Sequence, residues 1–513
     1  MQKSFDIAVL GSGFAGSLIA MIARRQGRSV VMVDRATHPR FAIGESSTPV
    51  ADFVLRELAS RYDLPRIAPL SRYGSWQQHY PEIGCGLKRG FTYYQHSAGE
   101  RFVPDEQHLR ELAVAASSDD ARADTHWVRA DVDAFLASEA ERMGVELHAG
   151  TTVERLEHLQ ADSPWELHLR RDGSAPCMRA RFLIDATGEG GILPKHLGLR
   201  DRTDLIHTNS EAVFSHFRDL PSWHDFLSRS GAKLDDYPFR CDDAAQHHLL
   251  DRGWIWMLRF QKNLASVGIA FMPDGTSGPG TDAHGRDPRL CSPNPDEAWR
   301  AWLDRYPSVA ELLAPAKVAA TPGRMIRAGR LQRRWEKAVG DDWALLPHTY
   351  GFIDPLHSTG IAFSLCGVER LANVLGQHWQ QPSCSAALRR YEHAVEREFE
   401  MIDRLVHGCY LTLGHFSLFT AYAMLYFVAA TTYERRRIEQ GFREDQFFLA
   451  ADEDRWNRLL RELHLEVIAW HRSGCGAWPA FPERVKRAIE PYNHVGLFDA
   501  NAHNMYQHTA PQK

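Results

Sequence analysis

One glycine-rich turn near the N-terminus restricts the fold more than any other feature. An apolar, β-rich run at residues 7–10 is followed by Gly11-x-Gly13-x-x-Gly16, an apolar helix and a second strand, "SVVMVD", that ends in Asp34. Gly11 permits the tight turn, Gly13 lets the backbone approach a pyrophosphate, and Gly16 lets helix and strand pack closely. The helix N-terminus offers N–H groups to the phosphates, and the Asp34 carboxylate can accept the ribose hydroxyls. This order of elements predicts a dinucleotide-binding Rossmann unit.

Three later segments favour FAD over NAD(P) as that dinucleotide. "RFLIDATGEGG" (181–191) is an apolar strand ending in an ATG element similar to that of glutathione-reductase-like flavoproteins. "WVRADVDAFL" (127–136) resembles the arginine-containing helix start of flavin monooxygenases, and "GFIDPLHSTGIAFSL" (351–365) resembles their late flavin-contacting turn and helix. A second GxGxxG unit does not follow in the sequence. We therefore expect a separate NAD(P)H flavin reductase to supply FADH2.

Composition and charge restrict the binding partners and the cellular setting that we expect for this protein. The 513 residues are enough for two or three domains, and the net charge of −5 comes from mixed charges without a long basic run, so nucleic acid is not an expected partner. The eight cysteines form no CxxC pair and no cluster at metal-ligand spacing, so we expect no metal and a reducing, cytoplasmic setting. No signal pattern opens the chain. The apolar segment 410–433 carries His415 and several hydroxyl residues, which favours a buried pocket helix over stable membrane insertion.

Four further signatures resemble those of flavin-dependent halogenases. They are "PRFAIGESSTPV" (39–50), "CGLKRGFTYYQH" (85–96), "GWIWMLRF" (253–260) and "DPLHSTGI" (354–361), and the resemblance runs from residue 5 to about 430. It is strongest to the phenol-acting branch, that of the phloroglucinol halogenase of pyoluteorin-type pathways. The resemblance implies an oxidoreductase of secondary metabolism that uses FADH2, oxygen and chloride or bromide to halogenate an electron-rich, phenolic ring.

The resemblance also implies catalytic roles. Hypohalous acid made beside the flavin is expected to pass a tunnel of Trp254, Trp256 and Pro355 to the reactive Lys88. Enclosure by aromatic residues should desolvate Lys88 and favour its neutral amine; the alternative is an ordinary charge on a strand edge. His357 stands where tryptophan-acting enzymes carry a glutamate, which argues against free tryptophan as substrate. This histidine could act as a base toward a phenol or be purely structural.

The cofactor and halide sites follow from the same resemblance. The halide is expected at the backbone of Ser358, Thr359 and Gly360, although Ser358 or Thr359 could also cap a helix. Glu45 and Ser46 could instead satisfy backbone groups of their own loop. Because Trp254 and Trp256 alternate along a strand, we expect one of them to face the core. The residues expected at FAD are Gly11, Ser12, Gly13, Phe14, Ala15, Gly16, Asp34, Arg35, Arg40, Glu45, Ser46, Ser47, Arg129, Val153, Asp185, Gly188, Asp354, Gly360 and Ile361.

Besides His357, the sequence departs from the patterns of related flavoproteins at two places. The tryptophan signature has Arg259 where the family has proline, which puts the local turn in doubt. Pro347-His348 stands where many flavin monooxygenases have Gly-Asp before the third flavin element.

The predicted fold class is α/β. A Rossmann-type FAD domain of the glutathione-reductase-like, p-hydroxybenzoate-hydroxylase-like type (1–90, 125–200 and 325–385) is interleaved with a mixed β-sheet substrate domain (91–124 and 201–324), and a helical region (386–513) follows. Two other functions stay open: a flavin monooxygenase that hydroxylates or epoxidises an aromatic or polyene, and a non-catalytic FAD-binding protein. A need for halide and Lys88 would separate them. The ring, the preferred halide, a free or carrier-tethered acceptor and a homodimer are also left open.

Overall fold

The computed structural model describes residues 3–158, 163–273, 287–507 and 509. Its first sheet has seven strands in the order β7-β2-β1-β10-β9-β8, with β18 beside β10. The strands are β1 (Lys3–Leu10), β2 (Val30–Val33), β7 (Glu146–His148), β8 (Thr152–His158), β9 (Trp165–Arg170), β10 (Cys177–Asp185) and β18 (Trp343–Leu345).

The centre of this sheet is parallel, as the glycine motif predicts. β1 pairs in parallel with β2 and β10, and β7 and β18 extend the parallel part, whereas β8 and β9 form an antiparallel flap. The last four residues of β1 are fully buried, as expected for a parallel strand covered on both faces. α1 (Phe14–Arg25) packs against α4 (Arg129–Arg142) and α10 (Thr359–Gln377). The predicted Rossmann-type α/β fold is confirmed.

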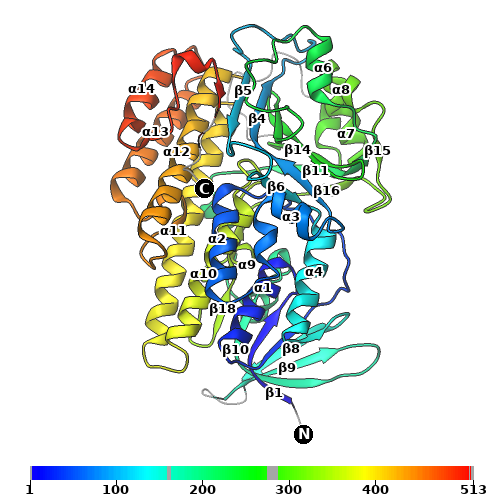
Figure 1. Cartoon of the computed structure of the whole chain (residues 1–513), viewed down its shortest axis with the longest axis vertical. Coiled ribbons are helices and arrows are strands. Elements are labelled where there is room, and N and C mark those ends of the chain that lie inside the picture. The colour runs from blue at the N-terminus through cyan, green and yellow to red at the C-terminus, as the bar shows by residue number, and fades with distance from the viewer. Residues whose placement is uncertain (1–2, 159–162, 274–286, 508, 510–513) are drawn as a thin grey trace.

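A nine-stranded mixed sheet forms the other end of the molecule (Figure 1). Its order is β15-β11-β14-β13-β12-β4-β5-β20, with β16 beside β11. Most pairs are antiparallel, but β12 runs parallel to β4, and β20 runs parallel to β5. The strands are β4 (Gly90–Gln95), β5 (Glu111–Ala115), β11 (Glu211–Arg218), β12 (Ala245–Leu249), β13 (Gly253–Phe260), β14 (Leu264–Phe271), β15 (Lys317–Val318), β16 (Ile326–Ala328) and β20 (Met505–Tyr506).

Two short strand pairs join these parts. β3 (Cys85–Lys88) pairs antiparallel with β6 (Asp124–Trp127), and β17 (Arg333–Arg334) pairs with β19 (Gly351–Phe352). β3 also contacts β13, because the Gln261 N–H just after β13 donates to the Cys85 carbonyl at 3.0 Å. The lysine stretch is therefore fixed to the large sheet at the C-terminal end of β13, one of its inner strands.

Long helices run along one side of both sheets (Figure 1). α10 packs on α11, and α11 packs in turn on α12 and α13. These helices are α11 (Cys384–Leu411), α12 (Phe416–Gln440), α13 (Asp454–Arg472) and α14 (Ala480–Ile489). The remaining helices are α2 (Pro49–Arg61), α3 (Tyr73–His79), α5 (Ile192–His196), α6 (Trp223–Arg229), α7 (Pro295–Asp304), α8 (Pro307–Leu313) and α9 (Pro347–Tyr350).

The proposed domain boundaries stay predictions. Two strands of the large sheet, however, lie in ranges that were assigned to other domains. β16 lies within the range assigned to the FAD domain and pairs with β11 of the large sheet. β20 lies in the C-terminal range expected to be helical and pairs with β5. The chain therefore returns to the large sheet twice, through strands of two and three residues that are too short to give a periodic signal.

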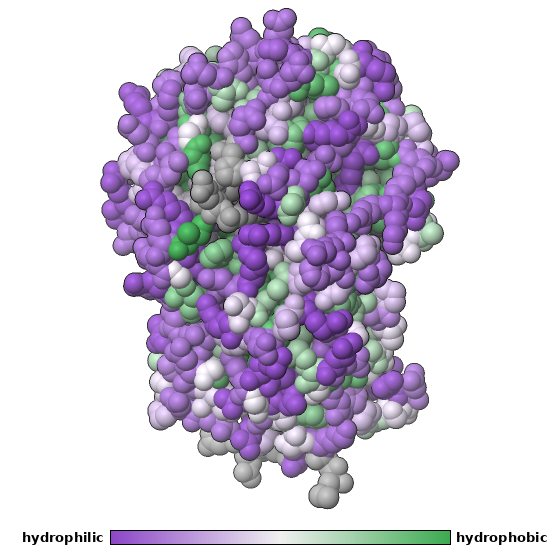
Figure 2. Space-filling view, in the orientation of Figure 1, coloured by the Kyte–Doolittle hydropathy of each residue, from purple (hydrophilic) through white to green (hydrophobic). Residues whose placement is uncertain are grey.

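α12 is the helix that raises the membrane question. By length and composition it could cross a membrane, but 89% of its most apolar window is buried inside the protein. On the molecular face of Figure 2, hydrophobic residues form scattered patches among hydrophilic ones. The apolar residues of α12 therefore pack in the interior of the protein, as the sequence predicts.

Candidate active site

The glycine turn between β1 and α1 forms a cradle that is open to phosphate groups. Gly11 has a φ of +96°, and a Cβ on Gly16 would lie 2.2 Å from the Gly11 carbonyl oxygen, so both positions require glycine. A Cβ on Gly13 would meet its nearest atoms only at 3.6 Å, one of them on Arg40. Gly13 is the N-cap of α1 and has no side chain, so the first N–H groups of α1 can donate to a pyrophosphate.

Arg129, the first residue of α4, joins three elements beside this cradle. Its guanidinium makes two bonds of 2.9 Å to the Asp133 carboxylate and donates to the carbonyls of Ile43 and Gly44 at 3.0 Å. It also lies 4.7 Å from the centre of the Phe14 ring at the start of α1. This places a fixed positive charge near the turn.

Asp34 follows β2 directly, and its surroundings keep its carboxylate ionised, so that it can accept hydrogen bonds. The Ser12 N–H and hydroxyl each donate to Oδ2 at 2.9 Å, and the Ala36 N–H donates to Oδ1 at 2.9 Å. Burial on its own would raise the pKa of Asp34, but these bonds and the Arg40 charge at 3.6 Å lower it. An ionised Asp34 carboxylate beside Arg40, with Arg129 near Gly13 of the same turn and an open helix start, fits the ribose and pyrophosphate of FAD.

The other residues predicted at FAD have different settings. Arg35 is exposed just beyond Asp34, Ala15 is half-buried in α1, and Ile361 is buried in α10. Val153 lies on β8, near Thr151, whose N–H donates to the Asp34 carbonyl at 2.9 Å. Their contacts with a cofactor stay predictions.

Asp185, at the end of β10, shapes the turn of the ATG element. It is fully buried and accepts the Thr187 hydroxyl at 2.6 Å and the Leu193 N–H at 2.7 Å. Burial raises its pKa, and these bonds act against that rise. The Gly188 N–H donates to the Thr349 hydroxyl oxygen at 3.0 Å. The ATG element is therefore held by Asp185 on one side and by Thr349 on the other.

The strap, residues 39–50, runs from the cradle to β6. The Trp127 N–H donates to the Glu45 carbonyl at 2.6 Å, and the Ser47 N–H donates to the Thr125 carbonyl at 2.9 Å. The Glu45 carboxylate pairs with His216 of β11 at 2.6 Å. Glu45 therefore bridges the strap and the large sheet.

Lys88 ends β3 and is held by the strap. Its side chain is 0% exposed, and Nζ donates to the Ser46 hydroxyl at 2.9 Å and to the Ser47 carbonyl at 2.6 Å. Nζ also lies 4.1 Å from the centre of the Phe91 ring, and the fully buried Asp124 is its register partner in β6. This burial excludes the alternative of a surface charge. Ser46 and Ser47, expected at the flavin, contact the lysine.

The predicted halide turn immediately precedes α10. His357 and Ser358 both have positive φ, at 75° and 54°, and Thr359 begins the helix. Ser358 is the N-cap, but among the described residues its side chain makes no capping bond, so the capping role considered for it is not found. A Cβ on Gly360 would lie 2.9 Å from the His348 ring, which packs on this first turn. Consecutive left-handed residues before a helix start make a concavity suited to an anion.

His357 itself is enclosed. Its Nδ1 lies 3.4 Å from the Tyr93 hydroxyl, its Nε2 lies 3.4 Å from the Cys409 sulfur, and its ring stacks on Tyr426 at 4.5 Å. Burial, with a smaller effect of His247, lowers its pKa to about 3. A neutral imidazole with this pKa is a weak base, so these contacts favour the structural alternative.

Trp254 and Trp256 lie on the same face of β13, because residues two apart in a strand share a face. The expectation that only one faces the core is wrong: the side chains are 1% and 7% exposed, and their rings are 5.8 Å apart. Trp254 donates to the Tyr410 hydroxyl at 3.0 Å, which donates to Asp354 at 2.8 Å. Burial raises the pKa of Asp354 to about 6. Asp354, which precedes Pro355, is thereby linked to the tryptophan pair.

Arg259, at the position of the family proline, lies within β13. β13 continues through Phe260. The Arg259 side chain donates to Asp242 at 3.0 Å and to the carbonyls of Leu220, at 2.8 Å, and Pro221. The substituted arginine therefore anchors the neighbouring loop.

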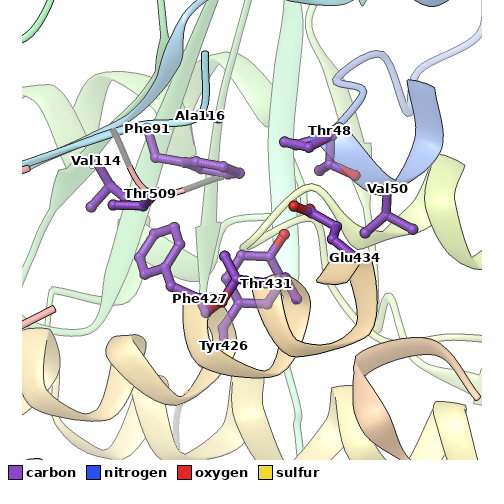
Figure 3. A pocket seen from close by; sticks show the side chains of 12 residues that line it. Thr48, Val50, Phe91, Val114, Ala116, Tyr426, Phe427, Thr431, Glu434 and Thr509 are labelled. Carbon is purple, nitrogen blue, oxygen red and sulfur yellow. The ribbon is translucent and has the colours of Figure 1, made fainter. Parts of the chain in front are cut away.

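A cavity lies between the strap, the large sheet and α12 (Figure 3). Its lining includes Thr48, Val50, Phe91, Val114, Tyr426, Phe427, Glu434 and Thr509. The ring of Phe91 lies 5.5 Å from that of Phe427 and 6.1 Å from that of Tyr426. Lys88 therefore contacts one aromatic wall of the cavity, and His357 of the halide turn stacks on another.

The prediction that the apolar segment 410–433 is a helix lining a pocket is confirmed for α12, which begins at Phe416, whereas residues 410 and 411 end α11. The individual lining residues of this segment were missed, as were Glu434 and Thr509. Glu434 lies three and four residues beyond Thr431 and Ala430, two other lining residues, so helical spacing from a known wall is the signal that could have found it.

One group of potential metal ligands lies away from this region. Glu166, His168 and Cys177 on β9 and β10 bring one ligand atom each to within 4.8 Å of one another. Glu166 also accepts from Arg179 at 2.8 Å, and Arg155 approaches His168 at 3.3 Å. These two cations disfavour a metal ion.

Comparison with known proteins agrees with this geometry. The tryptophan halogenase family matches residues 124–413, and the FAD dependent oxidoreductase family matches residues 6–222. Tetracycline 7-halogenase of Kitasatospora aureofaciens is 27% identical over 540 residues, which cover 98% of this chain and 90% of that protein. Monodechloroaminopyrrolnitrin halogenase PrnC of Pseudomonas fluorescens is 27% identical over 456 residues, which cover 85% of this chain and 73% of that protein.

The fold comparison points the same way. The crystal structure of halogenase PltM in complex with phloroglucinol and FAD matches with a TM-score of 0.82 and 25% identity, over 99% of this chain and 100% of that one. The predicted resemblance to flavin-dependent halogenases is confirmed. The chain therefore belongs to the tryptophan halogenase family, an enzyme family of flavin-dependent halogenases, and uses FAD and a halide.

Proposed function

We propose that this enzyme halogenates a phenolic ring at the cavity beside Lys88, with hypohalous acid as the halogen donor. The observation that carries the proposal is the fully buried Lys88, whose Nζ is fixed by Ser46 and Ser47 against the Phe91 wall of the cavity. Reduced FAD, when bound, supplies the oxygen chemistry that converts halide to hypohalous acid.

The residues of the chain have separate tasks in this proposal. The backbone N–H groups around Ser358 and Thr359 hold the halide. The stacked His357 and Tyr426, together with the tryptophan pair, separate the aromatic substrate from the flavin. Lys88 orients the hypohalous acid, either as an ammonium donor or as a haloamine. A ring C–H and hypohalous acid then become a C–halogen bond and water.

The cavity supports a small aromatic acceptor. Its aromatic residues offer stacking surfaces, and its single carboxylate and hydroxyl groups suit a hydroxylated ring. PltM has been crystallised with phloroglucinol, whereas more distant relatives are named as halogenases of pyrrole-2-carbonyl groups on a peptidyl-carrier protein. The similarity to PltM supports a free phenol. A separate flavin reductase and a cytoplasmic setting complete the proposal.

Product mass tests the proposal. The enzyme is incubated with FAD, a flavin reductase, NADH, oxygen and either chloride or bromide, and with phenol, resorcinol or phloroglucinol as acceptor. We expect a halogen isotope pattern on at least one acceptor, and its loss when halide is omitted. A halide-independent gain of one oxygen would contradict the proposal and identify a monooxygenase.

A further inference from the structure

An arginine near the predicted flavin site has hydrogen-bond donors to spare. Arg333 lies on β17, and its Nη2 donates to the His348 carbonyl at 2.6 Å. Its guanidinium carbon lies 5.4 Å from the centre of the Phe352 ring. The Arg333 Nε is buried without a hydrogen-bond partner, and the guanidinium forms no ion pair within the part of the chain that the structure describes. Since a guanidinium has five N–H donors, most of them are available to a ligand.

The charge of Arg333 is poorly compensated by the protein. Burial lowers the pKa of Arg333 to about 10, and the carboxylate of Glu189, directly after the ATG element, opposes this change without forming an ion pair. Glu189 is exposed, so water and salt screen its charge. At neutral pH Arg333 is still a cation, and a partly desolvated cation of this kind is stabilised by an anionic ligand.

The surroundings of Arg333 connect it with the cradle and the halide turn. α9, which carries His348, packs against both the turn at residues 188–190 and α10. Burial, and then the charges of Arg333 and Arg129, lower the pKa of His348 to about 3, so both guanidiniums act on one imidazole. That imidazole packs on Gly360, the start of α10. A cofactor that extends from the cradle at Arg129 to the halide turn therefore enters the field of Arg333.

The oxidation state of FAD decides how much it gains from such a field. The oxidised isoalloxazine ring is neutral, whereas the reduced ring readily loses its N1 proton and is then an anion. A positive charge near the ring therefore stabilises reduced FAD more than oxidised FAD. The pyrophosphate has the same charge in both states, so a cation beside the pyrophosphate alone would not distinguish them.

We propose that Arg333 makes the enzyme bind reduced FAD in preference to oxidised FAD, through its positive charge at the flavin end of the cofactor site. This preference would favour loading with FADH2 and release of FAD after turnover. The inference concerns the cofactor alone and needs neither Lys88 nor a phenol.

The midpoint potential of bound FAD tests the inference without turnover. The FAD-bound enzyme is reduced anaerobically beside a redox dye of known potential, at a mildly alkaline pH where the reduced ring is an anion. Comparison with free FAD gives the ratio of the affinities for reduced and oxidised FAD. We expect Arg333→Met to lower this ratio about tenfold, the lower end for a hydrogen bond to a charged group, which corresponds to a potential about 30 mV more negative.

Two variants control for general effects of the substitution. Arg330→Met removes an exposed arginine that donates to the Thr203 carbonyl at 3.2 Å, and it should leave the ratio unchanged. Arg333→Lys keeps the positive charge and should retain most of the wild-type ratio, which a purely structural role of the guanidinium would not predict.

The ratio in Arg333→Met decides the outcome. An unchanged ratio overturns the inference, and an equal loss of affinity for both oxidation states would place Arg333 at the pyrophosphate instead. If Arg333→Met does not retain FAD, Glu189→Gln decides: removal of this carboxylate strengthens the field of Arg333 and should raise the ratio about twofold. A ratio that is unchanged or lower in Glu189→Gln would then overturn the inference.

This result does not depend on the proposed function, because the measurement contains no halide and no acceptor. A tenfold lower ratio in Arg333→Met supports the inference whether or not a phenol is halogenated. An unchanged ratio rejects it even when the enzyme forms halogenated product.

Discussion

The flavin cradle and the lysine cavity are built in opposite ways. The cradle is a single turn with its glycines at 11, 13 and 16, surrounded by Arg40 and Arg129 and by their partners Asp34 and Asp133. The cavity is assembled from the strap, two strands of the large sheet, α12 and Thr509, and most of the side chains that line it are apolar or aromatic. The difference teaches that the cradle depends on backbone geometry close in sequence, and the cavity on packing between distant segments.

Lowering the pH should reduce the free energy of unfolding mainly through buried histidines around the lysine cavity. Burial is the main cause that lowers the pKa of His126, His247 and His357 to about 3, so the folded protein keeps them neutral. Their stabilising effect is complete above the unfolded pKa of about 6.5 and is lost as the pH falls towards 3, by about 1 kcal/mol per histidine for each pH unit. Asp354 acts in the opposite direction, because its pKa of about 6 favours the folded state as the pH falls.

Urea unfolding at pH 7.5, 6.5 and 5.5 measures this effect. We expect the free energy of unfolding to decrease by at least about 2 kcal/mol between pH 6.5 and 5.5, since these three histidines and His96, His348 and His464, whose pKa is also lowered to about 3, outweigh Asp354 and Asp243, whose pKa is about 6. A free energy of unfolding that is constant or increases towards pH 5.5 would show that these rings are not buried as neutral groups.

Gly16→Ala should disable the cradle and leave the cavity intact. The new Cβ would lie 2.2 Å from the Gly11 carbonyl oxygen, so α1 must move away from β1, at a cost of about 1–3 kcal/mol. The expected result is loss of most bound FAD, measured by flavin absorbance per mole of protein. Gly329→Ala is the matched control, because a Cβ there meets no atom within 4 Å. Full FAD occupancy in Gly16→Ala would contradict the assigned cradle.

Ser46→Ala should slow halogenation and leave FAD binding unchanged, which is the reverse of the effect expected for Gly16→Ala. The expected effect is also smaller. The substitution removes one acceptor of Lys88 Nζ, so we expect about a tenfold slower formation of halogenated product with unchanged FAD content. Ser47→Ala is the comparison, because Lys88 uses the Ser47 carbonyl, which the substitution keeps. A larger loss of product in Ser47→Ala than in Ser46→Ala would contradict the assigned roles of the strap.

The same contrast explains what could be predicted from the sequence. The glycine turn and Asp34 belong to a short motif whose spacing carries the chemistry, and Lys88 was predicted because its stretch resembles the lysine segment of flavin-dependent halogenases. The contacts of Ser46 and Ser47 with Lys88, and the position of Glu434 in the cavity, join residues about 40 to 390 positions apart and leave no local periodicity. The shared face of the tryptophan pair could have been predicted, because it follows from strand geometry alone.

The most direct test of the central claim uses Lys88→Met in one reaction mixture. Oxygen uptake and product mass are measured together, with FAD, a flavin reductase, NADH, bromide and the acceptor that the wild type halogenates. If the cradle supplies the oxidant and Lys88 delivers the halogen, the variant should consume oxygen at the wild-type rate and form about 10²- to 10⁴-fold less halogenated ring. Halogenated product at the wild-type level in Lys88→Met would contradict the claim.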